Sequence, residues 1–354
     1  VLTQRRRNFS TIGSAISMAL LVFVSTAAVQ AQSLLDNYSP VTLAELQEPP
    51  PGDWLMWRRT ANNWGYSPLD QINTDNVSSL RLAWSWTMEP GKQETTPLVH
   101  DGVMFLPQAC DFIEAVDATD GTPLWEYRRA TVDHPAPLSC ANRNGTLYKD
   151  QLLIATHDAY IVSLNATNGE VTWERQIGDW TVGQHYSGGP QVFNGKVITG
   201  MSGCCYINTS CWITAHDADT GEELWRTNTV PRLGEPNGES WGDLPNELRR
   251  GGSAWMPASF DAELNLIFIG VAVPIPWGTI QRDTRGGDVL YTNSTLALDA
   301  DTGEIAWYFQ HVPAGNWDQD HPYERLIVET EVTPDADAVS WMNPNIASSQ
   351  RQKV

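Results

Sequence analysis

Three cysteines gather in one short polar stretch, Ser-Gly-Cys-Cys-Tyr-Ile-Asn-Thr-Ser-Cys-Trp, at residues 202–212. Thiols at this spacing could form a disulfide, bind a metal ion or take part in redox chemistry. A bond from Cys204 or Cys205 to Cys211 would close a loop of about eight residues and stabilise the fold by about 2–3 kcal/mol. A vicinal Cys204–Cys205 ring and a thiolate zinc site are the alternatives, although the spacing matches no common structural zinc pattern. We favour the bond to Cys211 as a structural staple.

The compartment supports disulfides. The first 31 residues read as an export signal, with a basic Gln-Arg-Arg-Arg start, an apolar stretch over 15–29 and small residues before Gln32. An uncleaved anchor is the alternative, but the apolar stretch is short for a membrane span. An exported chain favours oxidised cysteines. The other two, Cys110 and Cys140, are then candidates for a second bridge, and one of the five cysteines is left over.

The charge balance excludes some partners. The chain has 354 residues, with 42 Asp and Glu against 22 Lys and Arg, and a formal net charge of −20. Binding to nucleic acid needs clustered Lys and Arg, so this composition does not favour nucleic acid as a partner. After cleavage of the signal, we expect no stable membrane span.

A repeated segment sets the architecture that must position these groups. Asp or Asn is followed by Gly four residues later and by Trp four residues after that, with the first residue at 117, 165, 217 and 299. Residues 76–84 look like a degenerate first copy, and the longer last interval carries an insertion. The Asp and Gly types predict a tight turn between two strands, and the Trp anchors the returning strand.

Between the repeats lie short alternating runs that follow turn signals, as in Asp101–Leu106 and Asn194–Gly200. Four short strands per repeat of about 45–50 residues are typical of a propeller blade. A β-sandwich with coincidental Trp spacing is the alternative. The sequence therefore predicts an all-β propeller of four-stranded blades over residues 32–354. Because a propeller closes by pairing its first and last blades, we expect this chain to be truncated at its C-terminus.

Several stretches together resemble the pyrroloquinoline quinone (PQQ)-dependent alcohol dehydrogenases. They are residues 53–86 (Asp-Trp-Leu-Met-Trp to Ala-Trp-Ser-Trp), the repeats, 291–311 and Asn-Trp-Asp-Gln-Asp-His at 316–321. The resemblance covers nearly all of residues 50–330. It implies an eight-bladed propeller with the quinone and a divalent metal on its axis, of which this chain holds about half.

The resemblance also implies a set of site residues. Asp288 matches the catalytic aspartate, which is also a metal ligand, and Trp255 matches the indole that stacks on the quinone. The other matches are polar contacts to the cofactor: Glu94, Arg143, Thr156, Ser202, Gly203 and Ser253. Each has a structural alternative, because Trp255 could be blade packing, Asp288 could cap a Gly-Gly-Asp turn, and Arg143 could be a loop residue. His157 and His321 are left out as isolated loop histidines.

These residue types suit the chemistry. A flat tricyclic tricarboxylate needs an aromatic face and cationic or hydroxyl partners for its carboxylates. A carboxylate near the substrate hydroxyl can accept the proton while hydride moves to the quinone. The metal site departs from the family pattern, because Cys205 stands where the family has a glutamate ligand and Val273 where it has an asparagine. Calcium or another divalent cation needs several oxygen ligands and retains only Asp288 here. Leu290 stands where lanthanide-dependent relatives carry a further aspartate.

The resemblance implies a periplasmic quinoprotein dehydrogenase that oxidises an alcohol or polyol and passes electrons to a cytochrome c or quinone. Two alternatives come from other classes: a non-catalytic propeller scaffold of the cell envelope, and an inactive fragment of a dehydrogenase. The family's vicinal disulfide lies elsewhere in the sequence, just before the arginine that Arg143 matches, where this chain has Ser139-Cys140. The bridge between Cys110 and Cys140 would then join neighbouring blades.

Overall fold

The structure is a computed structural model that describes residues 33–130, 140–205, 210–331, 335 and 337–338, with the backbone of 351–353. The export signal proposed at 1–31 lies outside these residues. In the described part of the chain, no helix has the length and apolar character that a bilayer span needs.

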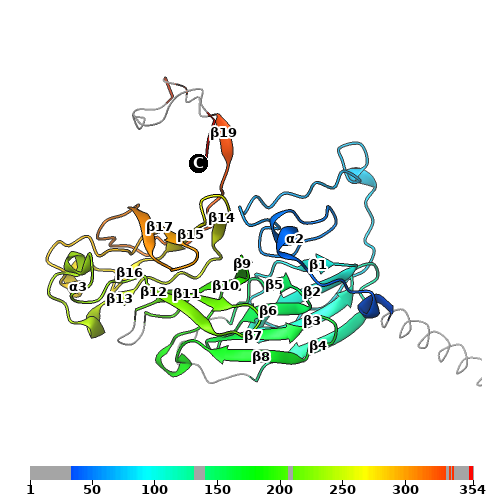
Figure 1. The fold of residues 1–354 in the computed structure, drawn as a ribbon, viewed down its shortest axis with the longest axis horizontal. Coiled ribbons are helices and arrows are strands. Elements are labelled where there is room, and N and C mark those ends of the chain that lie inside the picture. Colours follow the sequence, from blue (N-terminus) through cyan, green and yellow to red (C-terminus); the bar gives the residue numbers. More distant parts are fainter. Residues whose placement is uncertain are drawn as a thin grey trace, which may run out of the picture.

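Four antiparallel sheets of four strands follow one another along the chain, each with its strands adjacent in sequence order (Figure 1). The first sheet consists of β1 (Leu98–His100), β2 (Val103–Gln108), β3 (Phe112–Asp117) and β4 (Pro123–Arg128). The second consists of β5 (Thr146–Tyr148), β6 (Gln151–Ala155), β7 (Tyr160–Asn165) and β8 (Val171–Gln176). The third consists of β9 (Gln191–Phe193), β10 (Lys196–Gly200), β11 (Trp212–Asp217) and β12 (Glu223–Asn228). The fourth consists of β14 (Ser259–Asp261), β15 (Leu266–Val271), β17 (Ser294–Asp299) and β18 (Ile305–Gln310).

The first strand of a sheet lies deep in the molecule and the fourth lies outside. Strands β5, β9 and β14 are fully buried, whereas most residues of β4, β8 and β18 are exposed or half-buried. The middle strands carry the main apolar core. Radial four-stranded meanders of this kind are the blades of a β-propeller. The predicted fold class is confirmed, and the number of eight blades stays a prediction.

The insertion predicted in the last interval consists of two excursions. One leads from β12 to β14 through the 3₁₀ turns η4 (Gly238–Trp241) and η5 (Asn246–Leu248), and the other leads from β15 to β17. They meet where β13 (Arg250–Gly251) pairs with β16 (Pro274–Ile275). The remaining elements are α2 (Leu43–Gln47), η1 (Val77–Ser79), η2 (Ala109–Asp111), η3 (Trp180–Val182), α3 (Thr279–Arg282), β19 (Glu329–Glu331) and β20 (Arg351–Lys353).

The repeated turn has the predicted chemistry. In the first copy, the Asp117 carboxylate accepts hydrogen bonds from the Thr119 main-chain N–H at 2.8 Å and from its hydroxyl at 2.5 Å. Gly121 then closes the turn with φ +77°, a conformation that glycine adopts without a steric cost. Asn165 accepts from Thr167 in the same way, whereas Asp217 and Asp299 each accept from the main-chain N–H groups two and three residues later.

Three tryptophans of the repeat, Trp125, Trp173 and Trp225, pack on the glycine turn of the next sheet. A methyl group built on Gly169 would lie 2.6 Å from Trp125 Cε3, and one on Gly303 would lie 2.5 Å from Trp225 Cε3. Gly221 faces Trp173 in the same way. Trp84, in the degenerate copy, lies over Gly121 and donates its indole N–H to Ala118 O at 3.1 Å. The degenerate copy therefore forms no strand but keeps the docking contact, which is how neighbouring blades are joined.

Replacing Gly169 by alanine should destabilise the chain by about 2–4 kcal/mol, because the new methyl group meets Trp125 and the backbone has φ +74°. Gly195→Ala is a matched control, since Gly195 also has φ +74° but its nearest neighbour is Tyr148 Oη at 3.9 Å. That control should lose only about 1 kcal/mol, which is the conformational part alone. Urea unfolding of both variants measures the difference, and equal losses would exclude the docking contact as its source.

The candidate site residues share one end of the sheets. In an antiparallel meander, the connection into the first strand and the connection from the second strand to the third lie at the same end. Glu94, Arg143 and Trp255 precede β1, β5 and β14, while Thr156 and Ser202 follow β6 and β10.

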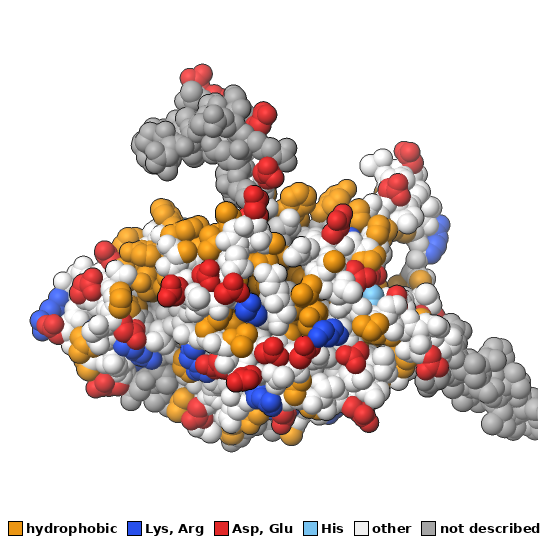
Figure 2. Space-filling view, viewed as in Figure 1, with side chains coloured by type: hydrophobic (Ala, Val, Ile, Leu, Met, Phe, Trp, Pro, Cys, Tyr) orange, Lys and Arg blue, Asp and Glu red, His pale blue; other side chains and the backbone are white. Residues whose placement is uncertain are grey.

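Figure 2 shows acidic side chains spread over one face of the molecule, with fewer basic ones between them.

Candidate functional site

Arg143 and Trp255 form the centre of the site. The guanidinium carbon of Arg143 lies 4.8 Å from the centroid of the Trp255 ring, and the Arg143 side chain is paired with Glu94. Arg143 also donates a hydrogen bond to Ser187 O at 2.9 Å. Burial lowers the pKa of Arg143, and the Glu94 carboxylate opposes that effect. Three residues from three different connections thus meet around one half-buried indole.

The edge of this indole contacts an acid that the sequence analysis did not single out. Trp255 Nε1 donates to Asp320 Oδ2 at 2.8 Å, and Tyr323 stands edge-on to the ring at 5.9 Å. Burial raises the pKa of Asp320, while the hydrogen bond from Trp255 acts in the opposite direction. The stretch Asn-Trp-Asp-Gln-Asp-His reads as a polar turn, so burial of one of its acids has no signal in the sequence.

The cysteines form two bridges, Cys204–Cys211 and Cys110–Cys140, and Cys205 is a free thiol. The staple predicted at 202–212 is confirmed, and so is the bridge between neighbouring sheets. Cys205 is not part of either bridge, so its inclusion among the disulfide candidates was wrong, and neither the vicinal ring nor the zinc site is formed. Cys204 and Cys211 are both fully buried, which explains why Cys204 rather than its neighbour makes the bond.

Ser202, Gly203 and Ser253 lie close to the staple. Ser202 Oγ is 3.5 Å from Ser187 Oγ, and Ser253 Oγ is 3.5 Å from Cys211 Sγ. Gly203 has φ +75°, and a methyl group there would lie 2.0 Å from Gly183 O. Gly203 is therefore required by the backbone geometry whether or not it contacts a cofactor.

The environment of Cys205 does not favour a thiolate. Burial and the nearby Asp320 carboxylate raise the pKa of the Cys205 thiol to about 11. A neutral thiol is a poor ligand for a hard cation, and Val273 offers no side-chain oxygen. In the described residues, no group of three His, Cys, Asp or Glu side chains could hold a metal ion. The residues present therefore do not fit the divalent metal that the resemblance implies, because Cys205 and Val273 supply no oxygen ligand.

Asp288 lies on the long connection between β15 and β17. Its side chain is exposed, whereas its main-chain oxygen accepts hydrogen bonds from Gln310 Nε2 at 2.8 Å and Ala314 N at 3.0 Å. The main chain is thus fixed while the carboxylate points into solvent. A carboxylate held in this way is accessible to a small substrate.

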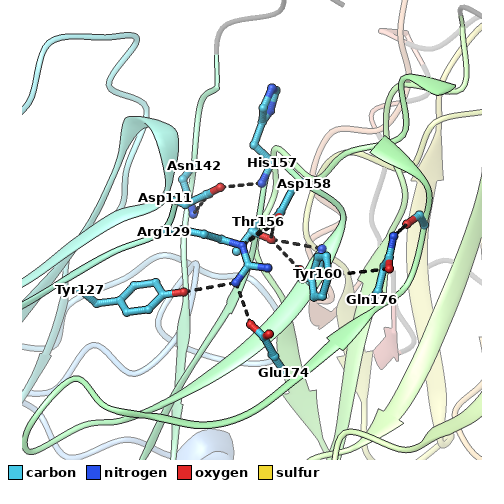
Figure 3. A network of polar contacts seen from close by, with 11 residues as sticks. Asp111, Tyr127, Arg129, Asn142, Thr156, His157, Asp158, Tyr160, Glu174 and Gln176 are labelled. Atoms are coloured by element: carbon cyan, nitrogen blue, oxygen red, sulfur yellow. Dashed lines mark hydrogen bonds and ion pairs between the residues drawn. The ribbon is translucent and has the colours of Figure 1, made fainter. Parts of the chain in front are cut away.

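Thr156 belongs to a buried polar network rather than to the Trp255 centre (Figure 3). Its hydroxyl donates to Asp158 Oδ1 at 2.5 Å and is fully buried. Arg129 binds both oxygens of Asp158, at 2.7 and 2.8 Å, and reaches Glu174 at 2.9 Å. The Thr156 side chain is therefore already used by the protein, which weakens the expectation that its hydroxyl contacts the cofactor.

Asp111 occupies the other side of this network (Figure 3). Its carboxylate accepts hydrogen bonds from His157 N at 2.7 Å and from Asn142 Nδ2 at 3.2 Å. Because Asn142 adjoins Arg143, these bonds tie the loop that carries Arg143 to the loop at 156–158. Burial raises the pKa of Asp111 to about 7, with the His157 bond opposing it.

Asp111→Asn should stabilise the chain at pH 8 and have little effect at pH 4. An unfolded Asp titrates near 4, so the folded state retains the Asp111 proton between about pH 4 and 7. Stability is then lost as the pH rises through this range and stays low above it. The amide also suits Asn142, whose Oδ1 has no partner in the described structure and could accept a hydrogen bond after an amide flip.

Urea unfolding of Asp111→Asn and of the parent at the two pH values measures this effect. Asp75→Asn, which changes an exposed acid outside the network, should show no pH-dependent difference. The charged or titratable groups that act on Asp111 include Asp158, Arg129 and Tyr127, and none of them is altered. A variant that is equally destabilised at both pH values would contradict the prediction.

Comparison with known proteins identifies the family. Residues 54–340 match the PQQ family described as glucose/ethanol/alcohol dehydrogenase, beta-propeller domain. The chain belongs to this family. It is 36% identical over 283 residues to quinohemoprotein alcohol dehydrogenase ADH IIB of Pseudomonas putida, and 36% identical over 302 residues to 1-butanol dehydrogenase (quinone) of Thauera butanivorans.

The solved structure of quinohemoprotein alcohol dehydrogenase ADHIIG from Pseudomonas putida HK5 matches this PQQ-family chain with a TM-score of 0.78 and 32% identity. That match covers 83% of this chain and 46% of the other. The two relatives compared by sequence each align with 75% of this chain, and the alignments span 41% and 48% of their lengths. The chain thus spans less than half the length of these relatives.

The donor set at Trp255 fits PQQ. The ring supplies a flat aromatic face, Arg143 supplies a guanidinium for a carboxylate, and Ser187 and Ser202 supply hydroxyls within the same neighbourhood. Ser187 was missed in the sequence because no repeat position marks it. Trp255, Arg143 and Glu94, which the sequence predicted as site residues, come together from three separate connections, and their contact with a cofactor stays a prediction.

Proposed function

We propose that this chain forms the cofactor-binding part of a PQQ-dependent alcohol dehydrogenase. The observation that supports this best is the position of Arg143, which lies over the Trp255 indole and is paired with Glu94, within a chain that belongs to the family. We further propose that the protein is exported to the periplasm, oxidises an alcohol or polyol, and passes electrons to a cytochrome c or quinone. The family relatives, which are named as alcohol dehydrogenases, support the substrate class.

Each residue of the site has a distinct role in this proposal. Trp255 would offer an aromatic face to the flat ring of PQQ, and Arg143 would pair with one of its carboxylates. Ser202 and Ser253 offer hydroxyls, and Glu94 holds Arg143 in place. Bound PQQ supplies a two-electron acceptor for hydride. Asp288 accepts the proton of the substrate hydroxyl at its carboxylate oxygen, which its exposed position allows.

Titration of the purified chain with PQQ, with and without calcium, tests this proposal. Absorbance and protein fluorescence report binding, and dye-linked oxidation of short alcohols reports turnover. We expect saturable binding that calcium changes by less than about three-fold, because Cys205 and Val273 replace two oxygen ligands. Absence of PQQ binding by the folded chain would refute the proposal and favour an envelope scaffold, whereas binding without turnover would indicate an inactive fragment.

A further inference from the structure

We propose that Asp320 is a positioning residue: its carboxylate fixes the orientation of the Trp255 indole and thereby the plane on which a flat cofactor lies. This inference rests on the proposed function for its consequence, but the contact itself belongs to the chain alone. Asp320 is not one of the repeat positions, and its role does not require contact with the reacting atoms.

Both oxygens of Asp320 are engaged. Oδ2 accepts the indole N–H of Trp255 at 2.8 Å, and Oδ1 accepts the main-chain N–H of Val273 at 3.2 Å. Trp255 precedes β14, whereas Val273 follows β15, so one side chain joins the two connections of the fourth sheet. Two donors that point at one small group need two acceptor atoms, which a carboxylate supplies and an amide does not.

The main chain of Trp255 is already fixed, so the ring orientation depends on side-chain contacts. Ala254 N donates to Met201 O at 3.0 Å, and Trp255 O packs so closely on Gly188 that a methyl group there would lie 2.4 Å away. The indole has one N–H, and a hydrogen bond at this ring edge covers neither face of the ring, whereas the Arg143 guanidinium lies over one face. Tyr323, edge-on at 5.9 Å, adds a second lateral contact.

The surroundings of Asp320 disfavour a charged carboxylate, so packing alone does not explain an acid at this position. Asp320 is half-buried, burial raises its pKa, and its Coulomb interaction with Asp318 raises it further. Cys205, which stands where the family has a metal ligand, is close enough for Asp320 to raise its thiol pKa. The two N–H donors therefore determine where the Asp320 carboxylate points.

Asp320→Asn is the informative change, because asparagine has nearly the same shape but a single acceptor oxygen. One of the two N–H donors must then face the amide NH₂, so asparagine cannot hold the indole and the Val273 N–H together, and the ring loses its fixed link to the connection after β15. We expect PQQ to bind about ten-fold more weakly to Asp320→Asn than to the parent chain. Asp318→Asn, the same change at an exposed acid two residues away, is the matched control and should leave PQQ affinity unchanged.

Two measurements decide between a positioning role and a general structural role. In ¹⁵N-indole NMR spectra of the cofactor-free chain, the Trp255 Nε1–H signal, assigned by its loss in Trp255→Phe, should move upfield and exchange faster in Asp320→Asn. In the Trp255→Phe background, Asp320→Asn should change PQQ affinity by less than two-fold, because the shared contact is already absent. Urea unfolding confirms that each variant is folded.

The outcomes are distinguishable. An unchanged Nε1–H signal in Asp320→Asn, or an equal loss of PQQ affinity with and without the indole N–H, would overturn the inference. A parent chain that binds no PQQ would instead refute the proposed function, and the NMR signal would still test the contact between Asp320 and Trp255.

Discussion

Replacing Arg143 by methionine should weaken PQQ binding by about a hundred-fold and leave the chain folded. Arg143 is the cation above the Trp255 ring, at 4.8 Å, and its side chain is only 14% exposed. A hydrogen-bonded pair with a charged partner contributes about 1.5–3 kcal/mol, and about 1.4 kcal/mol corresponds to a ten-fold change in affinity. The loss includes repulsion, since Glu94 would keep its ion pair with Lys92 but lose Arg143 and would then face an anionic cofactor. Fluorescence titration with PQQ measures it.

Three variants separate the contributions to this loss. Arg143→Lys keeps the charge but not the planar fork, so its affinity should lie between those of the parent and the methionine variant. Adding Glu94→Gln to Arg143→Met should recover part of the affinity, because it removes the repulsive carboxylate. Arg128→Met is the control, since Arg128 also lies over an aromatic ring, Phe112, and pairs with a glutamate, but on the outer strand β4. Parent-like affinity in Arg143→Met would limit Arg143 to anchoring its loop.

The blades could be predicted from the sequence because each repeat is a local unit. The turn at Asp117, the positive φ at Gly121 and the tryptophan that packs on it all lie within one or two repeats. Local hydrogen bonds and one steric requirement determine them, so the residue types are sufficient. The degenerate copy shows the limit of this reasoning, because Trp84 keeps its docking contact although its segment forms no strand.

The supporting residues of the site could not be predicted, because they depend on which loops meet. Asp111 follows Cys110 in a connection that sequence reasoning would leave in solvent. The bridge to Cys140, with Cys110 N donating to Cys140 O at 2.7 Å, draws the two loops together and buries the acid. Asp320 similarly meets Trp255 across 65 residues of sequence. Neither contact has a periodicity or a spacing that would reveal it.

The pairing of the three clustered cysteines shows a different limit. Cys204 and Cys205 are neighbours, so loop length scarcely distinguishes a bond from one or the other to Cys211. The structure distinguishes them by burial, because Cys204 lies in the core with Cys211 while Cys205 is half-buried. The sequence alone does not show whether Cys204 or Cys205 bonds to Cys211, and the fold decides between them.

Asp288→Asn should lower alcohol turnover by about 10²–10⁴-fold while PQQ affinity stays within about two-fold of the parent value. An amide cannot accept the hydroxyl proton, but it has nearly the same shape as the carboxylate. The main-chain bonds from Gln310 and Ala314 to Asp288 O do not involve the side chain and should survive. Dye-linked assays at saturating PQQ measure turnover, and absorbance titration measures affinity.

The control for Asp288→Asn is Asp283→Asn. Asp283 is an exposed acid on the same connection, with φ +53°, a conformation that asparagine tolerates well. Its change removes one negative charge five residues before Asp288 in the sequence and should leave turnover unchanged. An equal loss of turnover in both variants would therefore reflect charge rather than proton transfer. Parent-like turnover in Asp288→Asn would mean that Asp288 only caps its Gly-Gly-Asp turn. The Asp288 carboxylate and the Arg143–Trp255 centre come from different connections. Loss of turnover with retained PQQ binding would therefore show that Asp288 accepts the proton and that the residues around Trp255 bind the cofactor.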